Sequence, residues 1–140
     1  MEYRIVEGAE RMKTEDVIRL LRMTYWAGSR PAEKIEASLR NSDCFGIYAG
    51  DSERLAGFAR VISDHATTWY LCDVVIDPAY RHRGLGTALV SHIVSRPEYA
   101  ALRGILLTAD AHGLYGKFGF TSADGRAMTR APGAAGGGTP

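Results

Sequence analysis

The fold is decided by residues 73–87, which read Asp-Val-Val-Ile-Asp-Pro-Ala-Tyr-Arg-His-Arg-Gly-Leu-Gly-Thr. The residues from Trp69 to Ile76 are almost all apolar, which is typical of a strand covered on both faces. Pro78 ends this strand, because proline has no N–H for the ladder. Apolar side chains then repeat at the spacing of one helix face, at Leu85, Leu89, Val90, Ile93 and Val94. The stretch therefore predicts a buried strand, a short turn and an amphipathic helix.

Two glycines, Gly84 and Gly86, lie where this predicted helix begins. The N–H groups in the first turn of a helix have no acceptor within the helix, and they attract negative charge. Three basic residues stand directly before the first glycine, at Arg81, His82 and Arg83. A Gly-x-Gly pair alone would indicate only a loop with solvated arginines. The buried strand before it and the helix after it favour a phosphate or pyrophosphate site.

The motif differs from the two common nucleotide-binding loops. It has no lysine of the Walker type, and Leu89 stands where a dinucleotide-binding fingerprint has its third small residue. A strand that ends before a proline, followed by Arg81-x-x-Gly84-x-Gly86, instead resembles motif A of the Gcn5-related N-acetyltransferase (GNAT) family. Members of this family bind acetyl-coenzyme A (acetyl-CoA). The resemblance implies that the chain is an N-acetyltransferase with acetyl-CoA as its co-substrate.

The resemblance also assigns residues to the co-substrate. Backbone groups of the strand would pair with the pantetheine arm, and one N–H of this segment would polarise the thioester carbonyl. The loop and the first helical turn would hold the pyrophosphate. The implied cofactor-binding residues are Val74, Val75 and Ile76 on the strand, and Arg81, His82, Arg83, Gly84, Leu85, Gly86 and Thr87 after it.

Residues 108–120, Thr-Ala-Asp-Ala-His-Gly-Leu-Tyr-Gly-Lys-Phe-Gly-Phe, form a second informative stretch. They resemble the closing segment of the same family, in which a helix carries a tyrosine near the sulfur of coenzyme A. Tyr115 matches that tyrosine. A phenol is still protonated at neutral pH, so it can give its proton to a leaving thiolate as a general acid. The alternative is that Tyr115 is a half-buried core residue.

Asp73 interrupts an otherwise apolar strand, where an unpartnered carboxylate is costly. Many relatives carry an acidic residue on this strand, so the resemblance makes Asp73 a candidate base for the attacking amine, directly or through water. A structural carboxylate is an equal alternative. Cys72 beside it suggests a covalent acetyl-cysteine route, but a cysteine in a buried strand is usually inert. The residues expected to meet the acceptor are Tyr25, Trp26 and Arg30, with Arg60, Asp64 and His65 on the other side.

The 140 residues fit one domain, and 46% hydrophobic with 24% charged residues is an ordinary globular composition. Periodicity and turn residues predict the order β-α-α-β-β-β-α-β-α-β, which is that of the GNAT fold: α/β (α+β) with a mixed central sheet. The predicted strands lie near 3–6, 42–49, 55–62, 68–76 and 104–109, with final strands at Phe120 and 127–129. Besides the motif helix, helices are predicted at 14–26, 31–40 and 110–117. Residues 1–130 would form the N-acetyltransferase domain and residues 131–140 a Gly/Ala/Pro-rich tail.

A formal net charge of +1 gives no support for a nucleic-acid or membrane partner, and no apolar run approaches the length of a membrane span. Two distant cysteines and four scattered histidines form no metal-binding spacing, so no metal is expected. The N-terminal residues carry no signal-peptide pattern, and we expect a cytoplasmic protein with free thiols.

Three functional hypotheses follow. The first is an acetyltransferase that acts on a small-molecule or peptide amine, and a homodimer is left open. The second is a non-catalytic acyl-CoA-binding sensor or regulatory module, which would need neither Tyr115 nor Asp73. The third is another nucleotide-binding domain, which the missing lysine and third glycine disfavour.

Overall fold

A computed structural model describes residues 2–134 of the chain. Its centre is a five-stranded sheet in the order β1-β2-β3-β4-β5. The first four strands pair antiparallel, and β5 pairs parallel with β4. This mixed sheet with its helices confirms the predicted fold class. The strands are β1 (Tyr3–Glu7), β2 (Asp43–Ala49), β3 (Gly57–Ser63), β4 (Thr68–Ile76) and β5 (Arg103–Leu106).

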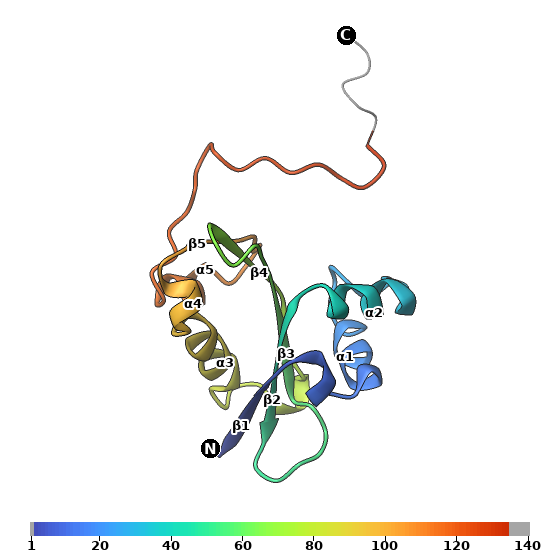
Figure 1. Cartoon of the computed structure of the whole chain (residues 1–140). Coiled ribbons are helices and arrows are strands. Elements are labelled where there is room, and N and C mark those ends of the chain that lie inside the picture. Colours follow the sequence, from blue (N-terminus) through green and yellow to red (C-terminus); the bar gives the residue numbers. More distant parts are fainter. Residues whose placement is uncertain (1, 135–140) are drawn as a thin grey trace.

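Helices lie on both faces of the sheet (Figure 1). One face carries α1 (Thr14–Leu21) and α2 (Ala32–Arg40), and the other carries α3 (Leu85–Val94), α4 (Pro97–Ala100) and α5 (His112–Gly116). Each face has its own cluster of buried apolar side chains, which confirms that the sheet is covered on both sides. Within the described residues, no helix has the length and apolar character needed to cross a membrane.

β4 carries a bulge at Asp73. The pairing with β3 shifts between Phe58–Val75 and Arg60–Cys72, so that two residues of β4 stand opposite one residue of β3. Asp73 has a φ of +56°, in the left-handed region that residues other than glycine rarely adopt. The bulge reverses the alternation of the strand. Before it, alternate side chains of β4 enter the cluster beneath α3, whereas after it Val75 enters the cluster beneath α1 and α2.

β4 and β5 separate after a short stretch of pairing. Thr68–Leu71 pairs with Arg103–Leu106, and beyond Leu71 this edge of β4 has no strand partner among residues 2–134. The backbone N–H and C=O groups of residues 72–76 on this edge therefore remain open to a ligand.

The turn from β4 into α3 is fixed by Asp77, which is 4% exposed. Its carboxylate accepts the Ala79 N–H (2.9 Å), which starts the 3-10 turn η2 (Pro78–Tyr80), and it also accepts Arg19 Nη1 (2.7 Å) from α1. Asp77 thereby joins the motif loop to the opposite helical layer.

Two element predictions were wrong. The final strands at Phe120 and 127–129 are absent, since residues 117–134 contain turns and no strand. Phe120 instead packs edge-on against Trp69 (5.8 Å between ring centroids), and residues 121–134 run away from the sheet (Figure 1). The first helix ends at Leu21 rather than Trp26, because residues 22–29 form turns. Of the predicted tail, residues 135–140 lie outside the described part of the chain.

Candidate active site

A cleft of about 590 Å³ opens where β4 and β5 separate. Its walls come from the α1–α2 connection, β3, β4, the segment that follows β5, and α5. The structure brings seven of the predicted site residues to this cleft: Tyr25, Trp26, Arg30, Arg60, Asp73, Val74 and Tyr115.

Tyr115 reaches the cleft from α5 and is 9% exposed. The ring of Phe120 packs edge-on against it, with 6.0 Å between ring centroids. Burial raises the pKa of the Tyr115 phenol above its ordinary value, and the negative charge of Asp110 adds to this effect. The phenol is therefore protonated at neutral pH, which a general acid requires.

The Asp73 carboxylate, which also lines the cleft, is the centre of a hydrogen-bonded cluster. Arg30 Nη1 donates to Oδ2 (2.8 Å), Arg60 Nε donates to the same oxygen (3.0 Å), and Trp26 Nε1 donates to Oδ1 (3.0 Å). The Asp73 side chain is 3% exposed. Burial raises its pKa, but the hydrogen bond from Arg30 and the charges of Arg60 and Arg30 outweigh burial and hold the pKa below the ordinary value. Asp73 is thus an ionised carboxylate surrounded by donors.

Two guanidinium groups share this one carboxylate. Arg60 also donates to the Ser42 hydroxyl (3.0 Å), and Arg30 makes a second, longer contact with Asp73 (3.4 Å). Their side chains keep 12% and 22% of their surface exposed. This wall of the cleft therefore keeps an unbalanced positive charge.

Two exposed aromatic side chains border the cleft next to these arginines. Tyr25 is 74% exposed and Trp26 is 45% exposed, and their rings meet edge-on at 5.1 Å. They stand here because α1 has already ended at Leu21, so both lie in the turns that lead to α2. Cys72 also lines the cleft, and burial raises the pKa of its thiol to about 11, although the nearby Arg60 opposes the shift. Such a thiol is protonated at neutral pH and is a poor nucleophile.

The first turn of α3 lies at the far end of β4. Gly84 is the N-cap with a φ of +78°, a backbone conformation that favours glycine. The Ala88 N–H is the first to bond within the helix, to the Gly84 carbonyl (3.0 Å). The N–H groups of the three residues before Ala88, at Leu85, Gly86 and Thr87, therefore have no helical acceptor.

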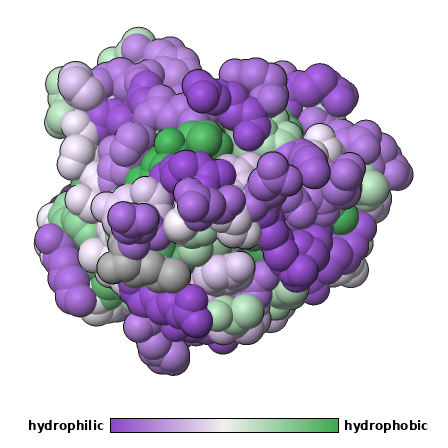
Figure 2. All heavy atoms as spheres, turned by 90° about the horizontal axis from the view of Figure 1, so that it is seen from below, coloured by the Kyte–Doolittle hydropathy of each residue, from purple (hydrophilic) through white to green (hydrophobic). Residues whose placement is uncertain are grey.

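The surroundings of this helix start suit an anion. Arg81, His82 and Arg83 are exposed. A Cβ on Gly86 would meet only Ile76, at 3.5 Å, among the described residues, so none of their contacts requires glycine there. This end of the molecule is at the bottom of Figure 1 and faces the viewer in Figure 2, where the surface is largely hydrophilic.

The other predicted residues do not line the cleft. Val75 is 7% exposed and packs beneath α1 and α2, while Ile76 packs in the cluster beneath α3. Residues 81–87 lie beyond the cleft, between the end of β4 and the first turn of α3. The predicted co-substrate residues thus follow one line, from the open edge of β4 to the start of α3.

Of the three residues expected on the other side of the acceptor, one lines the cleft and two do not. Arg60 enters the cleft, whereas Asp64 and His65 do not line it. Asp64 instead accepts hydrogen bonds from backbone N–H groups of its own turn, which lower its pKa. Tyr70 and Asp110 also line the cleft and were not predicted as site residues. Side chains alternate between the two faces of a strand, so Tyr70 could have been predicted to lie on the same face of β4 as Cys72.

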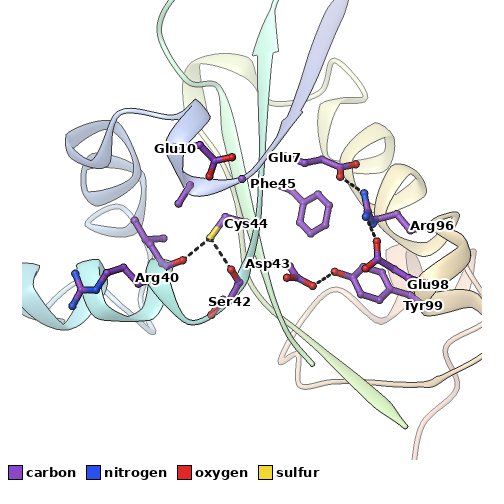
Figure 3. A pocket seen from close by; sticks show the side chains of 13 residues that line it. Glu7, Glu10, Arg40, Ser42, Asp43, Cys44, Phe45, Arg96, Glu98 and Tyr99 are labelled. Atoms are coloured by element: carbon purple, nitrogen blue, oxygen red, sulfur yellow. Dashed lines mark hydrogen bonds and ion pairs between the residues drawn. The ribbon is translucent and has the colours of Figure 1, made fainter. Parts of the chain in front are cut away.

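A second cavity of about 610 Å³ lies between α2, the start of β2 and α4 (Figure 3). It contains none of the predicted site residues. Several of its polar groups are paired with one another: Asp43 accepts the Tyr99 hydroxyl (2.5 Å), and Arg96 pairs with Glu7. Burial raises the pKa of the Cys44 thiol there to about 11. These contacts connect α4 and the residue before it to β1 and β2, so we interpret this cluster as structural.

Comparison with known proteins agrees with this geometry. The model of the acetyltransferase (GNAT) family matches residues 14–120. The chain is 34% identical over 92 residues to the histone acetyltransferase TAP1 of Glycine max, and the match covers 59% of this chain and 40% of that protein. It is 35% identical over 101 residues to the chloroplastic GCN5-related N-acetyltransferase 2 of Arabidopsis thaliana, which covers 59% and 39%. The chain thus spans about two fifths of the length of these relatives.

A crystal structure of a GNAT-family protein from Xanthomonas campestris pv. campestris superposes with a TM-score of 0.86 at 34% identity. The match covers 94% of both chains. Because the family model covers most of this chain and the full-length structural match agrees with it, the chain belongs to the Gcn5-related N-acetyltransferase family.

Proposed function

We propose that this protein is an acetyl-CoA-dependent N-acetyltransferase that moves an acetyl group to a primary amine by direct attack. The observation that carries the proposal is the cleft between β4 and β5, in which Tyr115 lies beside the unpaired edge of β4. The free N–H groups of the first turn of α3 stand at the end of the same strand.

This line of groups supports the binding of acetyl-CoA. The N–H groups of Leu85, Gly86 and Thr87 would bind the pyrophosphate, helped by the helix dipole and by the charges of Arg81 and Arg83. The open backbone of Val74, Val75 and Ile76 would pair with the amides of the pantetheine arm. The thioester would then lie in the cleft near Tyr115.

The transfer step needs an acid for the leaving group. The neutral amine attacks the thioester carbonyl carbon, and a new C–N bond forms. The C–S bond then breaks, its electron pair leaves with sulfur, and the thiolate takes the proton of the Tyr115 phenol. The raised pKa of Tyr115 keeps this proton in place until the thiolate develops. The phenolate is reprotonated by the proton that the amine releases, through water.

For Asp73, we propose a structural role rather than that of the base. Its carboxylate accepts hydrogen bonds from Arg30, Arg60 and Trp26, and its pKa lies below the ordinary value. A base of this kind has little tendency to take a proton from an ammonium group. Its positive-φ position at the bulge places it where it can hold the arginines and the indole at the acceptor side.

The acceptor is a small-molecule or peptide amine. A cytoplasmic location remains a prediction, and a homodimer is left open. The competing function is an acyl-CoA-binding sensor, which would bind the same co-substrate without turnover.

The experiment that separates the two functions is release of coenzyme A from acetyl-CoA with a panel of primary amines, followed with a thiol reagent. We expect turnover, and the Tyr115→Phe variant should lose about 100-fold or more in kcat, because general acids contribute on this scale. Tyr3→Phe, at an exposed position on β1, is the matched control. Binding of acetyl-CoA without turnover on any amine would favour the sensor.

A further inference from the structure

We infer that the acceptor amine also carries an anionic group, a carboxylate or a phosphate, and that Arg30 and Arg60 bind this group in the cleft. The inference rests on the proposed acetyltransferase function and names the chemical class of its acceptor.

One wall of the cleft carries more positive than negative charge. Arg30 and Arg60 both donate to Asp73, so two positive charges face one negative charge. One arginine would neutralise the carboxylate. Bringing a second guanidinium to a side chain that is 3% exposed costs desolvation, which a purely structural role does not require. The surplus positive charge borders the cleft, because Arg30 and Arg60 both line it.

Both arginines keep N–H donors that the protein does not use. A guanidinium has five N–H bonds in a fixed planar fork. Arg30 uses Nη1 and Nη2 on Asp73, and Arg60 uses Nε on Asp73 and Nη1 on Ser42. Each therefore keeps N–H groups for a ligand, and Asp73 fixes both guanidinium groups before the ligand arrives. Paired donors of this kind suit the oxygens of a carboxylate or a phosphate.

The cleft has a second carboxylate, on Asp110, which lies on a different element from the arginines. The exposed Asp110 also lines the cleft, but it belongs to the segment before α5 and lies close enough to Tyr115 to raise its pKa. The arginines belong to the α1–α2 connection and to β3. The cleft thus has two carboxylates on different elements: Asp73, which the arginines already pair, and Asp110, which stands before the helix that carries Tyr115. This pattern fits an acceptor that has an amine at one end and an anion at the other.

The test compares matched acceptors in the coenzyme A release assay. The carboxylate arm uses 4-aminobutanoate against 4-aminobutanamide, and the phosphate arm uses phosphoethanolamine against ethanolamine. We expect the anionic member of at least one pair to have a kcat/KM about tenfold or more above its neutral partner, because hydrogen bonds to a charged group are strong. Arg30→Gln should reduce this ratio about tenfold, while the KM for acetyl-CoA stays within about threefold.

Two further variants keep the test sharp. Arg40→Gln changes an exposed arginine at the end of α2, outside the cleft, and should leave the ratio unchanged. Arg30→Lys keeps the positive charge and should restore part of the preference if Arg30→Gln perturbs the fold. Equal use of anionic and neutral amines, or a preference that survives Arg30→Gln, would overturn the inference and leave the acetyltransferase function standing. Absence of release with all four amines and with the wider amine panel would contradict the proposed function itself.

Discussion

The substitution Asp73→Asn tests whether this carboxylate is a structural clamp or the catalytic base. Asparagine keeps the shape of the side chain and one acceptor oxygen, but it removes the negative charge that faces Arg30 and Arg60. Breaking a fully buried ion pair costs about 3–5 kcal/mol. The two arginine side chains are 22% and 12% exposed, so water recovers part of this cost. We therefore expect a loss of about 2–4 kcal/mol in the free energy of unfolding.

Urea unfolding of the two proteins at neutral pH measures this loss. Asp51→Asn, in the exposed turn after β2, is the matched control and should cost less than about 0.5 kcal/mol. The folded-state pKa of Asp73 is below its ordinary value, so its stabilisation is fully present above the unfolded pKa of about 4 and is lost as the pH falls through the folded pKa. The difference between wild type and Asp73→Asn should therefore shrink only in acid. A variant that stays as stable as wild type but loses more than about 100-fold in kcat would refute the clamp and restore Asp73 as the base.

Three further predictions follow from local geometry. The kcat/KM of the wild type should rise with pH as the acceptor amine loses its proton. It should fall again only above the ordinary tyrosine pKa of about 10, because burial raises the pKa of Tyr115. Tyr115→Phe should lack this alkaline fall, and a fall that persists in the variant would assign it to another group. Gly104→Ala would place a Cβ 2.7 Å from the Trp69 ring and should cost about 1–3 kcal/mol in the free energy of unfolding, measured in urea. As its control, Gly113→Ala places a Cβ with nothing within 4 Å and should be neutral or slightly stabilising. Equal effects of the two variants would contradict the close packing of Gly104 against Trp69. Asp77→Ala removes the acceptor for the Ala79 N–H and for Arg19, so the loop before α3 loses its anchor. The variant should lose about 2–3 kcal/mol in the free energy of unfolding and bind acetyl-CoA more weakly in calorimetry. An unchanged affinity for acetyl-CoA would show that this anchor does not support the co-substrate site.

The elements that the sequence predicts best are those with local causes. The apolar run of β4, the proline after it and the apolar stripe of α3 each lie within a few residues, and the structure confirms all three. The resemblance at Tyr115 likewise depended on one short segment, and α5 brings that residue to the cleft.

The parts that could not be predicted depend on distant segments. The cluster around Asp73 requires the register of β3 against β4, and a bulge at Asp73 shifts that register by one residue. No local pattern places Arg60 on the same carboxylate as Arg30. The apolar pattern of the first helix continues to Trp26, although the helix ends at Leu21, because these later side chains border the cleft instead of the core. The segment 127–129 was predicted as a strand, but it pairs with no strand among residues 2–134.

The central claim is that the open edge of β4 and the first turn of α3 bind acetyl-CoA. It is tested most directly by calorimetric titration of the purified protein with acetyl-CoA, coenzyme A, ATP and NAD, and of a Gly86→Glu variant with acetyl-CoA. Gly86 is suited to this test because its side-chain position meets only Ile76 within the protein, so the new carboxylate would face the ligand and not the core. We expect saturable binding of acetyl-CoA and coenzyme A, little binding of ATP or NAD, and loss of acetyl-CoA binding in the variant. A preference for ATP or NAD, or acetyl-CoA binding that is unchanged by Gly86→Glu, would contradict the account.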